Sequence, residues 1–356
     1  MELNPNLIAM AKRVYNNKMI TETDKDGKVI ASDEEALKKL VNEAFTSNNE
    51  INKVQAYKDF NKLIVTTAEE LAQPEIQKTI NLVAQYQKVG ANDIMQYNLD
   101  DMRTRVTTAL TATGTGVDFT KIPSYKKKVF ATPRKHQFGI KYSISRMVSD
   151  PVQEFKNATK LVAEEKVKYV MTQIYAVLKQ AVTNSKIPTK QIEQNANVTF
   201  TNFRRVESSL LRYGRNARPV MIADSALISS LAEKQAGVTI SGGTAPLFLT
   251  DELRQSLLRD IEIDQISKTM AIAIDNPWTD NMNSKVDLPI NEGILIAGGS
   301  ASPFRVTDFG DMAVLSDEIS NNMESEEVHM KISYKVDITL LLTRAVGYIK
   351  DTSITL

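Results

Sequence analysis

The chain has 356 residues, with 44 basic and 43 acidic side chains and no cysteine. This length allows two or three domains with a sizeable core. The balanced charge gives no global signal for nucleic acid or an anionic membrane, and the lack of cysteine excludes disulfides, thiolate nucleophiles and zinc–thiolate sites. The N-terminal residues lack the basic and apolar regions of a signal peptide, and no apolar run has the length of a membrane span. The lack of cysteine fits a protein made in a reducing cytoplasm, or a product that needs no disulfide for its stability, and we expect no membrane contact.

The first 90 residues are predicted to be mostly helical and polar. Amphipathic segments cover residues 7–16 and 34–45, and a longer helical pattern runs from 50 to 89 with an interruption at Pro74. An Asp-Gly pair at 26–27 favours a tight turn. The acidic residues around it resemble half of a calcium loop, but the first position is not Asp and the last is not Glu, so a plain turn is favoured; the residues concerned are Glu22, Asp24, Asp26, Gly27 and Asp33.

Residues 92–149 are predicted to be extended, because Thr, Gly and β-branched residues replace the helical pattern. Strand candidates are Tyr125–Phe130 and Gln137–Ser145. In the second, apolar and polar side chains alternate, which indicates a half-buried strand; the apolar ones are Phe138, Ile140, Tyr142 and Ile144.

Residues 121–149 contain eight basic side chains and no acidic one. This pattern is typical of a solvated edge strand protected by lysines. It also fits a contact arm for an acidic surface. Nucleic acid is a weaker third possibility, because few aromatic side chains here could stack on bases. The candidate contact residues are Lys126, Lys127, Lys128, Arg134 and Lys135.

A long helix is predicted directly after this segment. Asp150 is a good N-cap, Pro151 suits the first helical position, and Gln153 could close a capping box. No Gly or further Pro occurs before Thr183. At 1.5 Å per residue the helix is roughly 50 Å long, several times the length of an average globular helix. One apolar stripe lies along it, formed by Ala163, Val167, Val170, Met171, Ile174, Val177, Leu178 and Ala181.

The second half of the chain predicts a compact α/β unit followed by long strands. The unit contains a helix at 203–213, a strand at 219–223 and a helix beginning at Asp224, and two buried strands at 270–275 and 293–297 should share one sheet. The Gly242-Gly243 pair lacks the lysine and spacing of a phosphate-binding loop. Residues 304–315 lead to a long alternating strand at 328–339, and 340–349 are apolar enough to return to the core.

No constellation for catalysis is apparent. His136 and His329 are interpreted as solvated, so neither is expected to belong to a Ser–His–Asp triad. Adjacent carboxylates such as Glu164 and Glu165 point away from each other. There is no dinucleotide fingerprint, Walker motif or H-E-x-x-H sequence. We therefore predict no catalytic, cofactor-binding or metal-binding residues, and a protein that is not an enzyme.

The order of these parts resembles the major capsid proteins of tailed bacteriophages, which have the Hong Kong type capsid fold. The resemblance covers about residues 90–356 and rests on layout more than on an invariant motif. It is carried by Tyr142–Pro151 (YSISRMVSDP), Phe304–Met312 (FRVTDFGDM), Glu327–Ile338 (EVHMKISYKVDI) and Thr343–Ile349 (TRAVGYI).

The resemblance implies an α+β fold with an N-terminal arm, an extended β-loop, a long spine helix, a peripheral domain and an α/β axial domain. The implied boundaries are a helical arm at 1–97, the extended loop at 98–146, a peripheral domain at 147–204 and 313–339 with the spine helix at 150–184, and an axial domain at 205–312 and 340–356. The extended loop would lie on a neighbouring subunit, so the basic contact candidates would be inter-subunit contacts.

The implied function is a structural protein that self-assembles into an icosahedral capsid around the double-stranded DNA of a tailed phage. Its implied partners are copies of itself in hexamers and pentamers, scaffold, portal and decoration proteins, and DNA bound without sequence specificity. It would belong to the virion and assemble in the host cytoplasm. The alternatives are the shell of a bacterial nanocompartment with the same fold and, less favoured, a soluble enzyme or nucleic-acid-binding module.

Overall fold

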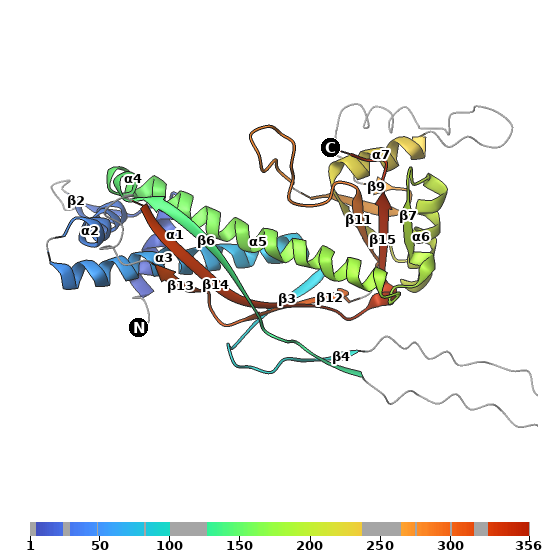
Figure 1. The fold of residues 1–356 in the computed structure, drawn as a ribbon, viewed down its shortest axis with the longest axis horizontal. Coiled ribbons are helices and arrows are strands. Elements are labelled where there is room, and N and C mark those ends of the chain that lie inside the picture. Colours follow the sequence, from blue (N-terminus) through green and yellow to red (C-terminus); the bar gives the residue numbers. More distant parts are fainter. Residues whose placement is uncertain are drawn as a thin grey trace, which may run out of the picture.

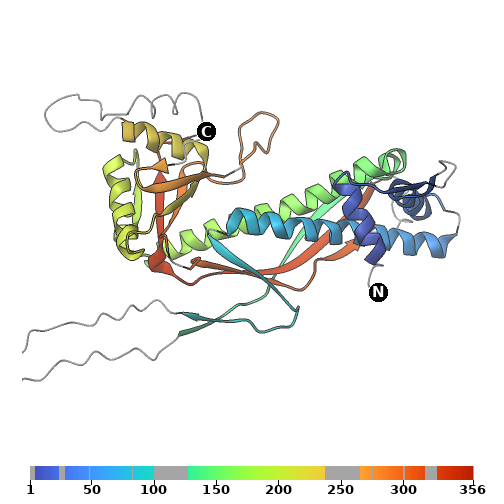
Figure 2. The same cartoon turned by 180° about the vertical axis from the view of Figure 1, so that it is seen from behind.

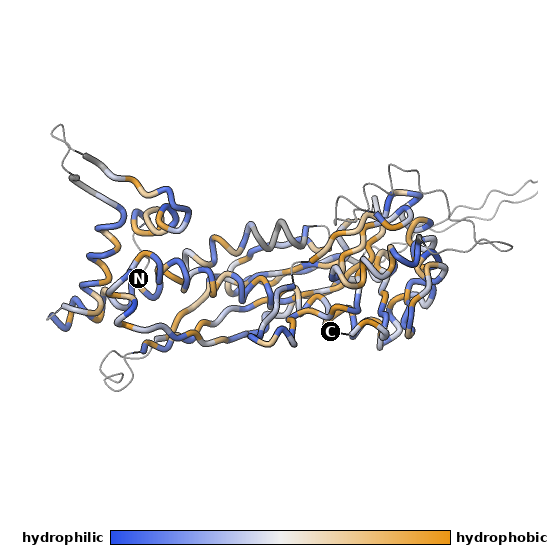
Figure 3. Tube along the Cα trace, turned by 90° about the horizontal axis from the view of Figure 1, so that it is seen from above, coloured by the Kyte–Doolittle hydropathy of each residue, from blue (hydrophilic) through white to orange (hydrophobic). Residues whose placement is uncertain are grey.

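The computed structural model describes residues 5–23, 29–47, 49–81, 83–99, 127–236, 265–274, 276–299, 301–316 and 327–355. The molecule is elongated (Figure 1). Two long helices and a twisted sheet form an extended body, and a compact α/β unit stands at one end of it (Figures 1 and 2). Apolar residues concentrate between the layers of both parts (Figure 3). No helix among the described residues is long and apolar enough to cross a membrane.

The N-terminal region forms three helices, α1 (Pro5–Tyr15), α2 (Asp33–Phe45) and α3 (Glu50–Ile80), with a hairpin of β1 (Thr21–Thr23) and β2 (Val29–Ser32) between the first two. Arg13 donates to both carboxylate oxygens of Asp33 at 2.8 and 2.7 Å, and the Ile20 backbone amide donates to it at 2.9 Å. Asp33, one of the residues of the calcium alternative, is therefore the counter-ion of Arg13. The turn at 24–28 lies outside the described residues.

Two expectations for this region are wrong. α3 continues through Pro74, because one missing backbone hydrogen bond is outweighed by the burial of its apolar face against the long helix. The helical pattern does not extend to Val89: residues 84–89 form β3 (Ala84–Val89), which pairs in parallel with β12 (Phe304–Phe309). The helices α1, α2 and α3 pack on the body and share its core. The ring centroids of Phe60 of α3 and Phe155 of the long helix lie 6.1 Å apart.

The strand and the long helix at the centre of the chain are confirmed. β6 (Arg134–Ser143) buries Phe138, Ile140 and Tyr142 more than their neighbours. The strand ends before the expected Ile144, which begins a short helix, α4 (Ile144–Ser149). α5 (Pro151–Thr183) follows, and its Gln153 amide donates to the Asp150 carboxylate at 3.2 Å, as expected of an N-cap. The capping box does not form, because the Asp150 backbone amide donates to the Arg146 carbonyl at 2.9 Å, and the Gln153 side chain donates to Asn157.

A five-stranded sheet supports α3 and α5. Its order is β13 (Ala313–Ser316), β14 (Glu327–Leu340), β12 and β3, and β6 pairs with the other edge of β14. The predicted alternation along β14 is confirmed from Val328 to Val336, with Val328, Met330, Ile332, Tyr334 and Val336 buried. It breaks beyond Val336, because Asp337 is buried and Ile338 is only partly buried. The buried side chains from Val328 to Val336 face the helices, so the sheet and the two helices share one core.

The compact unit is a mixed six-stranded sheet. Its order is β7 (Ile192–Asn195), β15 (Val346–Asp351), β11 (Glu292–Ile296), β8 (Val220–Ala223), β10 (Thr269–Ala273) and β9 (Gln265–Ile266). It carries α6 (Phe200–Tyr213) and α7 (Ser225–Ala236), with 3-10 turns at Thr189–Gln191 and Thr343–Ala345. The two strands predicted at 270–275 and 293–297 share this sheet with β8 between them. The Gly242-Gly243 pair lies outside the described residues.

Strand pairing corrects two expected boundaries. β12 was placed with the compact unit, but it pairs with β14 and β3 in the five-stranded sheet. β7 was placed with the long helix, but it pairs with β15 in the six-stranded sheet. Both errors have one cause: a strand belongs to the sheet of its hydrogen-bond partners, and those partners are distant in sequence.

Candidate functional site

The candidate contact residues lie at the base of a two-stranded ribbon and on the strand that follows it. β4 (Gln96–Leu99) pairs antiparallel with β5 (Lys127–Phe130). Tyr97 and Val129, opposite each other, face the body, and the Tyr97 hydroxyl lies 2.6 Å from that of Thr307 on β12. Lys128 and Phe130 alternate with Val129 and are exposed. The base of the ribbon is therefore anchored on one side and open on the other.

Of the five basic candidates, Lys126 lies outside the described residues, and Lys127 belongs to β5, although its side chain is not described. Lys128 is exposed on β5, and Arg134 and Lys135 are exposed at the beginning of β6. Among the described residues, none of these three side chains forms an ion pair with a carboxylate.

Strand register extends this basic surface onto β14. Lys135 stands opposite Lys335, and Lys141 stands opposite His329. Like charges directly opposite each other are destabilising within one chain. Lys141 is compensated by Glu327 at 3.0 Å. We call the outward surface of β6 and β14 the basic face; it consists of Lys135, Lys141, His329, Lys331 and Lys335. Arg134 pairs with Val336, so it lies on the opposite, helix-facing side of the sheet, where it is exposed at the beginning of β6.

The acidic side chains that follow β12 do not form a separate patch in the described part of the chain. Asp311 pairs with Lys88 at 2.7 Å, and Glu327 pairs with Lys141. Residues 317–326 lie outside the described residues. Within the described ranges, then, the basic face has no acidic surface of matching size next to it.

A buried ionic cluster joins the helices to the sheet, and sequence reasoning missed it. Lys166 of α5 is fully buried and donates to Asp308 of β12 at 2.6 Å. Glu69 of α3 lies 3.8 Å from the Lys166 ammonium and accepts from Lys88 of β3 at 2.8 Å. The Tyr86 hydroxyl donates to Asp308 at 2.6 Å. Four elements therefore meet at one group of matched charges, which we call the Lys166 cluster.

Burial and nearby carboxylates hold the tyrosines of this region in the neutral form. Burial, followed by Asp308, raises the pKa of Tyr86 well above its usual value. Burial also raises the pKa of Tyr334, whose ring centroid lies 5.8 Å from the Lys166 ammonium. A sequence signal existed: Lys166 follows Ala163 by three residues and precedes Val170 by four, so it lies on the apolar stripe.

A second junction ties the C-terminal half of α5 to the compact unit. Glu292 of β11 is buried, and its carboxylate pairs with Lys179 of α5 at 2.9 Å and with Lys350 of β15 at 3.0 Å. Within the compact unit, buried Glu207 of α6 accepts three hydrogen bonds of 2.8 Å from the turn before β10, donated by the Ser267 hydroxyl, the Lys268 backbone amide and the Thr269 hydroxyl. These buried carboxylates hold elements together.

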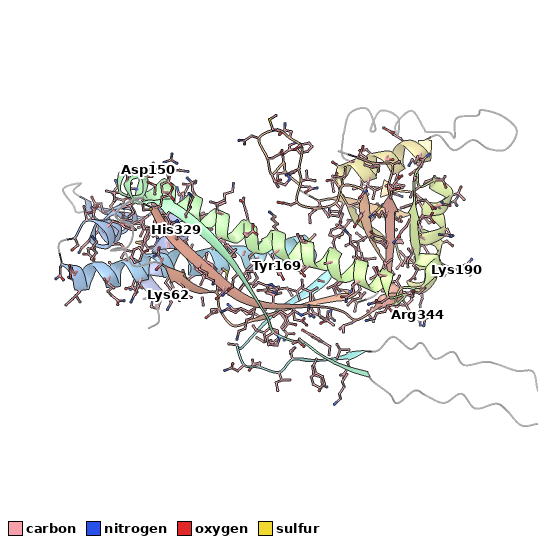
Figure 4. The ribbon with its side chains drawn as sticks, viewed as in Figure 1. Lys62, Asp150, Tyr169, Lys190, His329 and Arg344 are labelled. Atoms are coloured by element: carbon pink, nitrogen blue, oxygen red, sulfur yellow. The ribbon has the colours of Figure 1, made fainter. Side chains whose placement is uncertain are left out.

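The histidines do not form a catalytic arrangement. His136 is only partly exposed, and its ring lies within hydrogen-bond distance of the Tyr169 hydroxyl and packs near Tyr334. The expectation that His136 is solvated is therefore wrong, because β6 brings it against Tyr169 of α5, which Figure 4 labels. Burial lowers its pKa. His329 is about half exposed on β14, as expected, and its ring lies 3.9 Å from Glu327. In the described ranges, no group of three or more potential ligands is arranged to hold a metal ion.

Comparison with known proteins shows the family of this chain. The model of the family described as "SPbeta prophage-derived putative capsid protein YonB" matches residues 6–350. The chain belongs to the YonB family. It is 31% identical over 340 residues to the SPbeta prophage-derived protein YonB of Bacillus subtilis (strain 168), covering 95% of this chain and 94% of the relative. The predicted resemblance to phage capsid proteins is thus confirmed.

Solved structures with similar shapes share little sequence with this family member. A chain of the satellite phage P4 procapsid matches with a TM-score of 0.48 and 9% identity, covering 80% of this chain and 90% of that chain. A chain of Microbacterium phage Oxtober96 matches with a TM-score of 0.47 and 11% identity, covering 76% of this chain and 89% of that chain. A chain of the SrpI encapsulin complex of Synechococcus elongatus PCC 7942 matches with a TM-score of 0.41 and 12% identity, covering 79% of this chain and 89% of that chain. The assignment to a phage shell protein rests on the family match.

Proposed function

We propose that this chain is the subunit of a closed icosahedral shell that encloses the double-stranded DNA of a tailed phage. Membership of the YonB family carries this proposal. The elongated shape supports it, because extended elements of one copy need other copies to cover their open faces (Figure 1). In this role the chain acts structurally, and its partners are copies of itself in hexamers and pentamers.

Within such a subunit we assign the body of α3, α5 and the five-stranded sheet to the peripheral domain. The six-stranded unit with α6 and α7 is assigned to the axial domain. Residues 98–146 are assigned to the extended loop, of which the structure describes 98–99 and 127–146. The Lys166 cluster and the Glu292 junction keep the two domains in one orientation, since both hold α5. Assembly from identical copies requires that the two domains keep this relative orientation.

The basic candidates are proposed as inter-subunit contacts. Lys128, Arg134 and Lys135 are exposed and have no ion pair within the described residues, so an acidic group of a neighbouring copy can compensate them. Lys126 and Lys127 precede them in the same run. Scaffold, portal and decoration proteins are further proposed partners, and the packaged DNA is bound without sequence specificity. Assembly takes place in the host cytoplasm and the product is the virion.

Electron microscopy of the purified chain tests this function. The expected result is closed shells or rings of five and six copies, and DNA in particles from phage-producing cells. A well-folded species that stays monomeric at every concentration would contradict the proposal. Particles that hold a protein cargo in place of DNA would select the nanocompartment alternative.

A further inference from the structure

A hairpin between β10 and β11 carries the only tryptophan of the chain. We call residues 276–290 the edge hairpin. Trp278 is 49% exposed and Met282 is 85% exposed. Tryptophan is enriched among the side chains that dominate the binding energy of protein interfaces.

The edge hairpin is held in one conformation by its own hydrogen bonds. Trp278 and Val286 form a β-bridge, and the Thr279 amide donates to the Lys285 carbonyl at 2.9 Å. The Asp280 carboxylate accepts from the backbone amides of Ser284 and Lys285 at 2.8 and 3.0 Å.

The base of the hairpin is closed by its own hydrogen bonds and is joined to α5 by an ion pair. The Asn276 side-chain amide donates to the Leu288 carbonyl, and the Leu288 amide donates back to it, each at 3.0 Å. Asp287 pairs with Lys168 of α5 at 2.7 Å. The apolar tip is therefore presented rigidly, which lowers the entropy lost on docking.

The opposite side of the molecule carries a second exposed apolar pair. Phe130, at the end of β5, is 56% exposed, and Ile94, in the turn before β4, is 83% exposed. The Ala131 amide donates to the Met95 carbonyl, so the two segments are joined next to these side chains. In the view down the shortest axis, the edge hairpin (orange) projects on one side of α5 and the β4–β5 ribbon on the other (Figure 1). Both therefore project in the plane of the two longer dimensions.

We infer that the edge hairpin of one copy docks on the base of the β4–β5 ribbon of the next copy, with Trp278 and Met282 against Ile94 and Phe130. This inference rests on the proposed shell function. A shell one subunit thick covers the largest area when the shortest axis of each copy lies along the shell normal, so protrusions in the plane meet neighbours. Two different patches in contact make a head-to-tail interface, which closes into a ring when the rotation permits.

Trp278 itself reports this contact, because it is the only tryptophan. On assembly its emission maximum shifts to shorter wavelength and acrylamide quenches it less than in free subunits. If shells form and Trp278 stays as accessible as in free subunits, the docking inference fails and the shell function stands. If no assembly forms under any condition, both fail.

Substitutions at exposed positions separate docking from folding. Met282→Lys should raise the subunit concentration needed for assembly by about tenfold or more, since it places a charge in an apolar contact. Ile51→Lys is the matched control, because Ile51 is 82% exposed at the beginning of α3. Both variants should melt at the temperature of the original subunit. Equal assembly of Met282→Lys and the original chain would overturn the inference.

The lack of cysteine allows the partner surface to be identified by cross-linking. The double variant Met282→Cys, Phe130→Cys, treated in the assembled state with a short bismaleimide, should give a ladder of covalent oligomers. Each single variant should stay monomeric on a denaturing gel, and so should Ile51→Cys, Phe130→Cys. Dimers from Met282→Cys alone would show a contact between two identical hairpins and overturn the head-to-tail arrangement.

Discussion

The Lys166 cluster and the basic face use the same kinds of side chain in opposite ways. In the cluster, Lys166 is fully buried and meets Asp308 at 2.6 Å, with Glu69 nearby. On the basic face, Lys135 and Lys331 stand exposed, without a carboxylate partner among the described residues. A buried charge must be matched inside the chain, whereas an exposed one is solvated and remains available to another molecule. The comparison separates charges that stabilise one subunit from charges that can join two.

The largest effect is expected for Lys166→Met. The substitution keeps the apolar stem but leaves Asp308 buried without its counter-ion, which should lower the free energy of unfolding by about 3–5 kcal/mol. Denaturant unfolding measures it. Lys160→Met on the same helix is the matched control, because Lys160 is exposed and pairs only with exposed Glu164, and it should change the value by about 0.5 kcal/mol or less. Equal effects of the two substitutions would contradict the role of the Lys166 cluster.

Glu207→Ala should give the next largest loss of stability. Glu207 is a buried carboxylate that accepts hydrogen bonds from two hydroxyls and a backbone amide. Its removal leaves three donors of the turn before β10 without their acceptor, which should cost about 2–3 kcal/mol. The melting temperature measures the loss. Glu233→Ala, at an exposed position of α7, should leave it nearly unchanged. Since neither position contacts the basic face, neither result depends on assembly.

A smaller effect on stability, dependent on pH, is expected at the Arg13–Asp33 pair. This pair is more exposed than the Lys166 cluster and less exposed than the basic face. The hydrogen bond from Arg13 holds the pKa of Asp33 below its usual value. A carboxylate with a lowered folded-state pKa contributes stability above its unfolded-state pKa of about 3.9, and this contribution is lost as the pH falls through the folded-state pKa. Melting temperatures measured from pH 5 downward should therefore fall less steeply for Asp33→Asn and Arg13→Gln than for the original chain. Parallel curves for all three would contradict this interpretation.

The smallest effect on the subunit is expected from reversing the charge of three exposed contact candidates. Changing Lys128, Arg134 and Lys135 together to Glu should alter the free energy of unfolding by less than about 1 kcal/mol, because each side chain is exposed. Assembly should nevertheless fail or become strongly dependent on salt, since every copy repeats the changed contact. Light scattering at low and high salt measures assembly. Normal shells under both conditions would mean that these side chains only solubilise the surface, and shells with less DNA would identify nucleic acid as their partner.

The sequence located the exposed basic residues and placed Lys166 on an apolar stripe, but it did not show which residues of distant strands lie beside them. The run of basic residues predicted an exposed surface at Lys128, Arg134 and Lys135, and the exposure is confirmed. The register that adds Lys331 and Lys335 of β14 to this surface depends on pairing between strands almost 200 residues apart, so no local pattern shows it. Lys166 was visible as a charge on an apolar stripe, but its partner Asp308 could be recognised only after β12 was placed beside α5.

The sequence by itself determined the elements whose signal is local: the N-cap at Asp150 and the uninterrupted helix α5, the alternating strand β14, and the helix–strand–helix order of α6, β8 and α7. Only the tertiary structure decided that α3 continues through Pro74, that residues 84–89 form a strand, and that β12 and β7 join the sheets they do. The physical reason is that helix caps and periodicity act over a few residues. Sheet membership and burial of a charge depend on partners that the fold brings from far along the chain.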